Sequence, residues 1–390
     1  MSYNHSEYIL LSLVLSSFLV TSVFVPTMVG YLFVTVVFAV SLLWLNLIGK
    51  MKFTLYRSVL WSYLSVVLLF VFGTVWNPSI RGFMRLGIFI GVTSVILFSI
   101  VHTVNFKKFW RLYGLFTAVI VLIGSPTVFI DQVSLGPVVI SSYGTAPPTP
   151  LNAGINVVSS IFNNPNNFGL VCSFAATGLI VTQEPSRYIN ILTLVNVFGV
   201  FISDGQSAQL ALIAGIGIFA VGQFNRSVVP LVTVTALGTI TTGLLMAFQL
   251  LPGPETLSAI SLSGRRHLWW ASVQALEVRP WIGYGTVNMA EVLRTYISDP
   301  LRLGAGPHNS YIRIALSAGV IGLISYVYLH LYALFQSAKQ SSHDTLAPHA
   351  MLWSAIIIQL FNGATMFGIS SSSILFTIVL GWSLRELSID

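Results

Sequence analysis

The chain has 390 residues, of which 55% are hydrophobic and only 7% are charged. Soluble globular domains carry about 25% charged residues, so this composition excludes a soluble enzyme or binding domain and indicates a protein with many membrane spans. The formal net charge of +7 is spread over many connections without a dense basic patch, which argues against nucleic acid as a partner.

Apolar runs recur along the whole chain. A spanning helix needs about 20 apolar residues, and the first run follows MSYNHSEY, which has neither the basic start nor the cleavage site of a signal peptide. We therefore expect the first run to remain as a span. The sequence predicts an all-α polytopic membrane protein with about 12 spans, at residues 8–25, 28–48, 58–76, 86–104, 112–130, 167–183, 189–203, 207–222, 228–250, 314–335, 351–369 and 373–384.

The basic residues between these segments predict the orientation. With the N-terminus in the cytoplasm, all five lysines fall on the cytoplasmic side, and the short outer connections near Pro26, Asp204 and Ser370 carry neither lysine nor arginine. Short cytoplasmic loops are enriched in both residues. We therefore expect a protein of the plasma (inner) membrane with both termini in the cytoplasm.

The outer side then holds arginine but no lysine. A guanidinium binds phosphate through two parallel hydrogen bonds, whereas a lysine acts as a point charge. The pattern indicates an anionic ligand at the outer face, and the alternative is chance combined with arginines that reach to the lipid headgroups. The outer arginines are Arg81, Arg85, Arg265, Arg266, Arg279, Arg294, Arg302 and Arg313.

The outer connection before the sixth predicted span, and that span itself, contain further residues of interest. Residues 131–166 are rich in Gly, Pro, Ser and Asn, which predicts a partly ordered rim on the outer side. Asn166 or Asn167 is a candidate N-cap of the next helix, and capping explains these asparagines as well as ligand binding does. The single cysteine, Cys172, lies in an apolar run and is expected to be a packing residue.

The interiors of the spans contain no Asp, Glu, Lys or Arg. Proton- and ion-coupled transporters usually carry such residues at membrane depth, and many have paired broken helices, which the sequence does not indicate. A transporter is therefore the weaker interpretation.

A long outer segment precedes the late spans. From Ser263 to Pro280 it has the pattern of an amphipathic helix, with Trp269 and Trp270 suited to a membrane interface. Arg265 lies one turn before Trp269 on the same face, where a lipid diphosphate would neutralise it. The alternative is that Arg265 and Arg266 bind ordinary lipid headgroups.

At the end of this segment, His308 and Asn309 stand directly before the next span, beside Tyr311. A histidine can take a proton from a sugar hydroxyl near neutral pH. The alternative for His308 is a residue that only hydrogen-bonds the end of the helix.

Several short motifs follow one another in a fixed order: S-G-R at 263–265, L-W at 268–269, P-x-x-G-x-G at 280–285, H-N-S-Y at 308–311 and A-G-V-I-G at 318–322. Together they resemble the O-antigen ligase and polymerase superfamily. That superfamily consists of polytopic GT-C-type glycosyltransferases with a large outer loop. The expected layout is a transmembrane bundle at 1–250, a catalytic outer loop containing amphipathic helices at 251–309, and C-terminal transmembrane helices at 310–390.

The resemblance implies that His308 activates an acceptor hydroxyl and that Arg265 holds a donor diphosphate. Members often carry a second arginine after the seventh span, where this chain has Gln206, so an outer arginine such as Arg81 or Arg85 is expected to replace it. Glu291 and Asp299 are alternative bases. The candidate substrate-binding residues are Arg266, Asn309, Tyr311, Arg81, Arg85 and Asn166.

We thus expect an O-antigen ligase-like glycosyltransferase that moves a glycan from a polyprenyl-diphosphate carrier to a lipid, glycan or protein acceptor. No cofactor or metal is expected, because the outer acidic residues are scattered singly. A polysaccharide polymerase and a protein glycosyltransferase share the same motifs. A lipid-linked glycan or solute transporter and a structural membrane subunit are the alternatives from other classes.

Overall fold

The computed structural model describes residues 6–49, 51, 53–136, 138–145, 154–182, 186–247, 250–254, 265–340 and 343–386. Within these ranges a helix overlaps each of the segments predicted to span the membrane. The helices are α1 (Ser6–Phe18), α2 (Thr27–Leu47), α3 (Arg57–Trp76), α4 (Ile80–Phe98), α5 (Phe106–Gly124), α6 (Pro165–Val181), α7 (Arg187–Ile202), α8 (Gln206–Phe224), α9 (Val229–Ala247), α13 (Ser310–Gln340), α14 (His343–Phe361) and α15 (Ser371–Glu386).

The protein is a mostly helical polytopic membrane protein, and the number of spans remains a prediction. Seven helical segments in the described ranges are long and apolar enough to cross a membrane: Thr27–Leu47, Arg57–Trp76, Ile80–His102, Phe106–Val128, Gln206–Phe224, Arg226–Met246 and Ser310–Gln340. Four more apolar helical segments are shorter: Ser6–Thr21, Pro165–Val181, Arg187–Ile202 and Thr345–Phe361.

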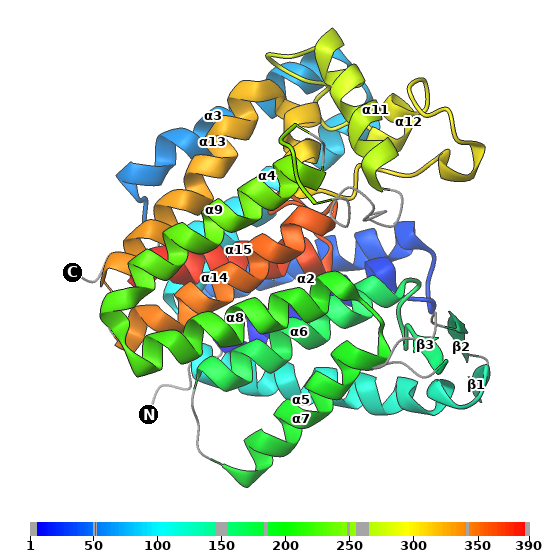
Figure 1. Cartoon of the computed structure of the whole chain (residues 1–390), viewed down its shortest axis with the longest axis vertical. Coiled ribbons are helices and arrows are strands. Elements are labelled where there is room, and N and C mark those ends of the chain that lie inside the picture. The colour runs from blue at the N-terminus through cyan, green and yellow to red at the C-terminus, as the bar shows by residue number, and fades with distance from the viewer. Residues whose placement is uncertain are drawn as a thin grey trace.

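The helices differ in what surrounds them. α6 is buried on nearly all sides and α15 is almost entirely buried, which places them inside the bundle (Figure 1). The Cys172 thiol of α6 is free and buried, in agreement with the packing role predicted for it. On the outside, Leu32 of α2, Trp61 of α3 and Leu231 of α9 are 66%, 77% and 68% exposed. Large apolar side chains at this exposure are suited to contact with lipid.

The outer connection predicted as a rim contains a small antiparallel sheet that the sequence analysis did not predict. Its strands are β1 (Gln132–Leu135), β2 (Val138–Thr145) and β3 (Asn156–Val158), in the order β1-β2-β3. The predicted N-cap is wrong by two or three positions. Asn164 caps α6, because its Oδ1 accepts the amide of Asn166 at 2.7 Å and Pro165 occupies the first turn.

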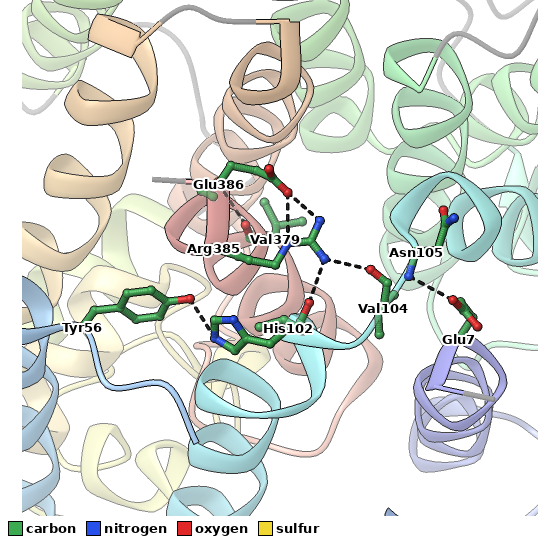
Figure 2. A network of polar contacts seen from close by, with 10 residues as sticks. Glu7, Tyr56, His102, Val104, Asn105, Val379, Arg385 and Glu386 are labelled. Carbon is green, nitrogen blue, oxygen red and sulfur yellow. Dashed lines mark hydrogen bonds and ion pairs between the residues drawn. The ribbon is translucent and has the colours of Figure 1, made fainter. Parts of the chain in front are cut away.

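A polar network joins the beginning of α1, the end of α15 and the connection between α4 and α5 (Figure 2). The amide of Asn105 donates to Oε1 of the buried Glu7 at 3.0 Å. Arg385 donates to the carbonyls of Val101 and Val104 at 3.0 and 2.8 Å. The first and last helices therefore meet on one side of the bundle. In Figure 1 both chain ends are marked on the left, whereas the three strands and the helices α11 (Arg265–Val278) and α12 (Met289–Leu293) lie on the right.

Candidate functional site

The long loop docks into a break in α13. Gly319 interrupts this helix with φ 69° and ψ −174°. The loop segment 280–285 binds both edges of the break: Val320 N donates to Pro280 O at 2.7 Å, and Tyr284 N donates to Leu316 O at 2.7 Å. The motifs at 280–285 and 318–322 are therefore two halves of one structural unit, which accounts for their occurrence together.

Only glycine fits at the break. A Cβ on Gly319 would overlap the carbonyl group of Trp281, and its positive φ disfavours any L side chain. The loop is in turn pressed against α3, where the backbones of Gly285 and Gly73 meet without room for a side chain on either. These close approaches fix the loop relative to the first half of α13, which begins at Ser310.

His308 stands directly before α13 in a left-handed conformation, with φ 46°. This region is uncommon for a residue with a side chain, so the surrounding contacts must hold it there. Trp269 of α11 is 1% exposed, and its indole N–H donates to the carbonyl of Pro307 at 2.7 Å. Trp269 thus anchors the histidine from inside the protein rather than facing the membrane interface as predicted, whereas Trp270 is exposed.

The residues after His308 bind the end of α14. Asn309 Nδ2 donates to Leu360 O at 2.9 Å, while its Oδ1 accepts the amide of Ile312 at 3.0 Å and so caps α13. Ser310 Oγ donates to Asn362 O at 2.7 Å. The predicted span at 351–369 is therefore displaced: α14 ends at Phe361, and the carbonyl groups that follow are satisfied by the first turn of α13. Asn309 positions His308 through these bonds.

A cavity of about 320 Å³ opens beside His308. It shares Tyr31, Phe89 and Arg313 with a neighbouring cavity of about 220 Å³, which contains Arg85. That cavity shares Arg85 with a third, of about 670 Å³, which contains Arg81. The three cavities neighbour one another through these shared lining residues, and we refer to the three together as the groove.

Two arginines set the electrostatics at the histidine. Burial lowers the pKa of His308, and the charges of Arg265 and Arg313 lower it further. Burial also lowers the pKa of Arg265, whose guanidinium lies 6.0 Å from the centre of the Phe361 ring. On the other side, Arg313 Nη1 donates to Gly363 O at 2.9 Å. Arg265 thus lies near the last residue of α14, and Arg313 binds the stretch that follows this helix. The two charges favour the neutral form of His308, which can accept a proton.

Residues 191–327 match the family model described as O-Antigen ligase. The match covers only part of the chain, and it supports an O-antigen ligase-related family. The matched residues run from α7 to the middle of α13, so they include Arg265, His308, Arg313 and the glycine break. No match was found among curated proteins. The family supports a membrane function of the O-antigen ligase or polymerase type in polysaccharide biosynthesis.

Four of the predicted substrate-binding residues, which are Arg266, Asn309, Tyr311 and Asn166, lie outside the lining of the groove, as does the predicted catalytic Arg265. Arg266 is partly buried on α11. Asn166 is exposed, whereas its neighbour Asn167 lines the cavity of His308. Tyr311 packs edge-on against Tyr326, with ring centres 5.8 Å apart, and belongs to the interior of the bundle.

The alternative bases do not line the cavity of His308. Glu291 lines the cavity that contains Arg81, and its Oε1 accepts a hydrogen bond from Asn288 at 3.2 Å. Asp299 forms an ion pair with Arg302 at 3.1 Å. Among the described residues, no group of three or more His, Cys, Asp and Glu side chains comes together as a metal site would require.

Arg313 is the site residue that the sequence analysis left out of its candidate set. Arg313 follows Asn309 by four residues, so the two lie on the same face of the helix. This spacing is the sequence feature that could have pointed to Arg313. Its contact with Gly363 lies 50 positions away in the sequence and depends on the end of α14. Gln206, which the resemblance placed at the position of an expected arginine, is exposed at the start of α8.

Proposed function

We propose that this protein transfers a glycan from a polyprenyl-diphosphate carrier to an acceptor hydroxyl at the outer face of the plasma membrane. The observation that carries the proposal is His308, held in a left-handed conformation beside a cavity and flanked by Arg265 and Arg313. A constrained, neutral histidine between two cations suits a base that acts next to a phosphate leaving group.

In the proposed reaction, the acceptor oxygen attacks the anomeric carbon of the glycan. The new C–O bond forms as the bond from that carbon to the diphosphate oxygen breaks, and the electron pair leaves with the diphosphate. His308 takes the proton of the acceptor hydroxyl. Arg265 stabilises the charge that grows on the leaving diphosphate, the usual effect of a fixed cation placed where negative charge develops.

The walls of the groove support a lipid-linked donor. Tyr31 and Phe89 line the cavity of His308 and come from α2 and α4. On the same helices Leu32 and Met84 are 66% and 61% exposed, so an apolar surface suited to a polyprenyl chain begins beside the groove. The carrier would thus keep its chain in the bilayer while its diphosphate reaches the arginines.

A transporter is less well supported. Many transporters bind their substrate at broken helices near the middle of the membrane. The break at Gly319 is instead filled by backbone from the loop, with hydrogen bonds to Pro280 and Tyr284. Movement of substrate through this point would require those bonds to open.

The proposal is tested in cells that lack the protein and are complemented with wild type, Arg265→Ala or Arg294→Ala. Arg294 is exposed at the end of α12 and serves as the control. We expect wild type and Arg294→Ala to restore transfer and Arg265→Ala to fail, because the leaving diphosphate loses its cation. Analysis of the carrier-linked glycan gives the readout. Full rescue by Arg265→Ala would contradict the proposed role.

The same measurement separates the two reactions of the family. Long glycan that remains on its carrier in the deleted cells identifies a ligase. Single repeats that never lengthen identify a polymerase. Transfer to a protein appears as loss of a glycosylated protein.

The pH dependence follows from the direction of the His308 shift. Because the pKa lies below its ordinary value of about 6.5, the base is neutral at pH 7, and transfer should decline only as the pH falls through the lowered pKa. Arg265→Gln removes a positive neighbour, favours the protonated ring and raises this pKa, so the acid limb of its residual rate should move to higher pH. Rates measured in purified, reconstituted protein from pH 5 to 8 check this. A limb that moves to lower pH would refute the assignment.

A further inference from the structure

The connection between α14 and α15, residues 362–370, forms much of the wall beside His308. Every residue of this connection except Met366 lines the cavity of His308. Residues 365–369 are buried although they form no helix or strand. Irregular backbone inside a membrane bundle is stable only where neighbouring groups satisfy its N–H and C=O groups. The bonds that hold this connection therefore also shape the cavity.

Side chains from three helices bind the backbone of Met366. The amide of Met366 donates to the hydroxyl of Tyr326, on α13, at 3.2 Å. Its carbonyl accepts from Thr93 of α4 and from Thr377 of α15, each at 3.0 Å. Both polar groups of this buried residue are thus satisfied by side chains that lie far apart in the sequence. Met366 is the point at which the connection is tied to the bundle.

The Tyr326 hydroxyl is itself fixed by buried polar side chains. It donates to Gln359 Oε1 at 2.5 Å, and Gln359 Nε2 lies 3.1 Å from His330 Nε2. His330 Nδ1 lies 2.9 Å from the carbonyl of Tyr326, which can only accept, so Nδ1 carries the proton and Nε2 accepts from Gln359. The hydroxyl proton is therefore committed to Gln359, and an oxygen lone pair is left for the amide of Met366.

This set of bonds is unusual for its surroundings. Tyr326, His330 and Gln359 are 0%, 2% and 0% exposed and lie on apolar helices. Polar groups at such positions are costly unless each is hydrogen-bonded, and an ionisable residue within a membrane segment usually has a functional role. The three side chains form a closed set of bonds whose outward contact is the amide of Met366.

We propose that Tyr326 is a positioning residue for glycan transfer, an inference that rests on the proposed function. Through the amide of Met366 it holds the neighbouring Thr365 and Phe367, which line both the cavity of His308 and the cavity next to it. The Tyr326 ring also packs beside Phe367, with ring centres 6.3 Å apart. Tyr326 itself lines none of the three cavities, so it acts through the connection and does not touch the substrate.

The first test measures the connection without turnover. Ala364→Cys places a thiol on the cavity wall, and its labelling by a small maleimide is followed in the full chain in nanodiscs. The native Cys172 is fully buried, so the parent chain gives the background. Adding Tyr326→Phe should raise the labelling rate by about fivefold or more, because the Met366 amide loses its partner. Tyr328→Phe, an exposed position on the same helix, should leave the rate unchanged.

The second test measures transfer of a carrier-linked glycan well below the unfolding temperature of every variant. Tyr326→Phe should lower kcat by about tenfold and leave KM for the donor nearly unchanged, because misplaced walls cost the reaction more than binding. Thr93→Val removes a bond to the same residue from another helix and should give the same signature. If both act through Met366, the double variant loses less than the product of the two effects. Thr93→Val also serves where Tyr326→Phe fails to fold.

The outcomes separate this role from simple stabilisation and from the proposed function. A purely structural Tyr326 would lower the unfolding temperature and leave kcat at the wild-type value, which overturns the positioning role. Labelling of the Ala364→Cys thiol that Tyr326→Phe does not change would show that Tyr326 does not hold the connection. Failure of wild type to transfer any carrier-linked glycan would overturn the proposed function, and that result is read from wild type alone.

Discussion

Replacement of His308 by asparagine is expected to lower the rate of glycan transfer by about 100-fold or more, the usual contribution of a general base. Asparagine is chosen because it tolerates the left-handed conformation that His308 adopts at φ 46°. The backbone at the start of α13 should therefore keep its geometry, and the loss should be chemical. Transfer from a purified carrier-linked glycan, measured in reconstituted protein, gives the rate.

His267 provides the matched control for this experiment. It lies exposed on α11, in the same loop, and lines none of the three cavities. His267→Asn should transfer at the wild-type rate. His308→Asn should also bind the donor about as well as wild type, because the arginines remain. If His308→Asn transfers glycan normally, the histidine only supports the helix end, and the proposed mechanism is wrong.

The positions of the helices were largely predictable, because the apolar runs that fit a membrane are long and nearly free of charge. The error at α14 shows the limit of that signal. The helix begins at His343 and passes through Pro348, whereas the apolar run suggested a later start. A membrane helix tolerates such a proline. Its end at Phe361 depends on bonds from Asn309 and Ser310, which hydropathy does not contain.

The candidate site was predictable only in part. His308 and Arg265 followed from the order of short motifs, and the fold places the charge of Arg265 close enough to lower the pKa of the histidine. The groove could not be predicted, because Tyr31, Arg85 and Arg313 come from α2, α4 and α13 and meet only in the folded protein. The inward-facing position of Trp269 could not be predicted either, because a tryptophan in an amphipathic helix equally suits a membrane interface.

The break in α13 links the fold to the site. The first half of the helix, from Ser310, carries Arg313 and is capped by Asn309, while its far end is bound by Tyr284 and Gly285 of the loop. A change at the break therefore alters the placement of the residues around His308, although the break itself lies outside the three cavities.

Gly319→Ala is expected to abolish transfer and to lower the thermal stability of the protein. Its φ of 69° with ψ of −174° lies in a region that only glycine adopts readily, so backbone strain alone costs about 1–3 kcal/mol. The new methyl group would also overlap the carbonyl of Trp281, which forces the loop away from α13.

Gly217→Ala in α8 is the control, because a Cβ there meets no atom within 4 Å and alanine favours a helix. Unfolding temperature and transfer rate in detergent-purified protein provide the measurement. If Gly319→Ala matches Gly217→Ala in both, the docking of the loop into the break does not hold the site together.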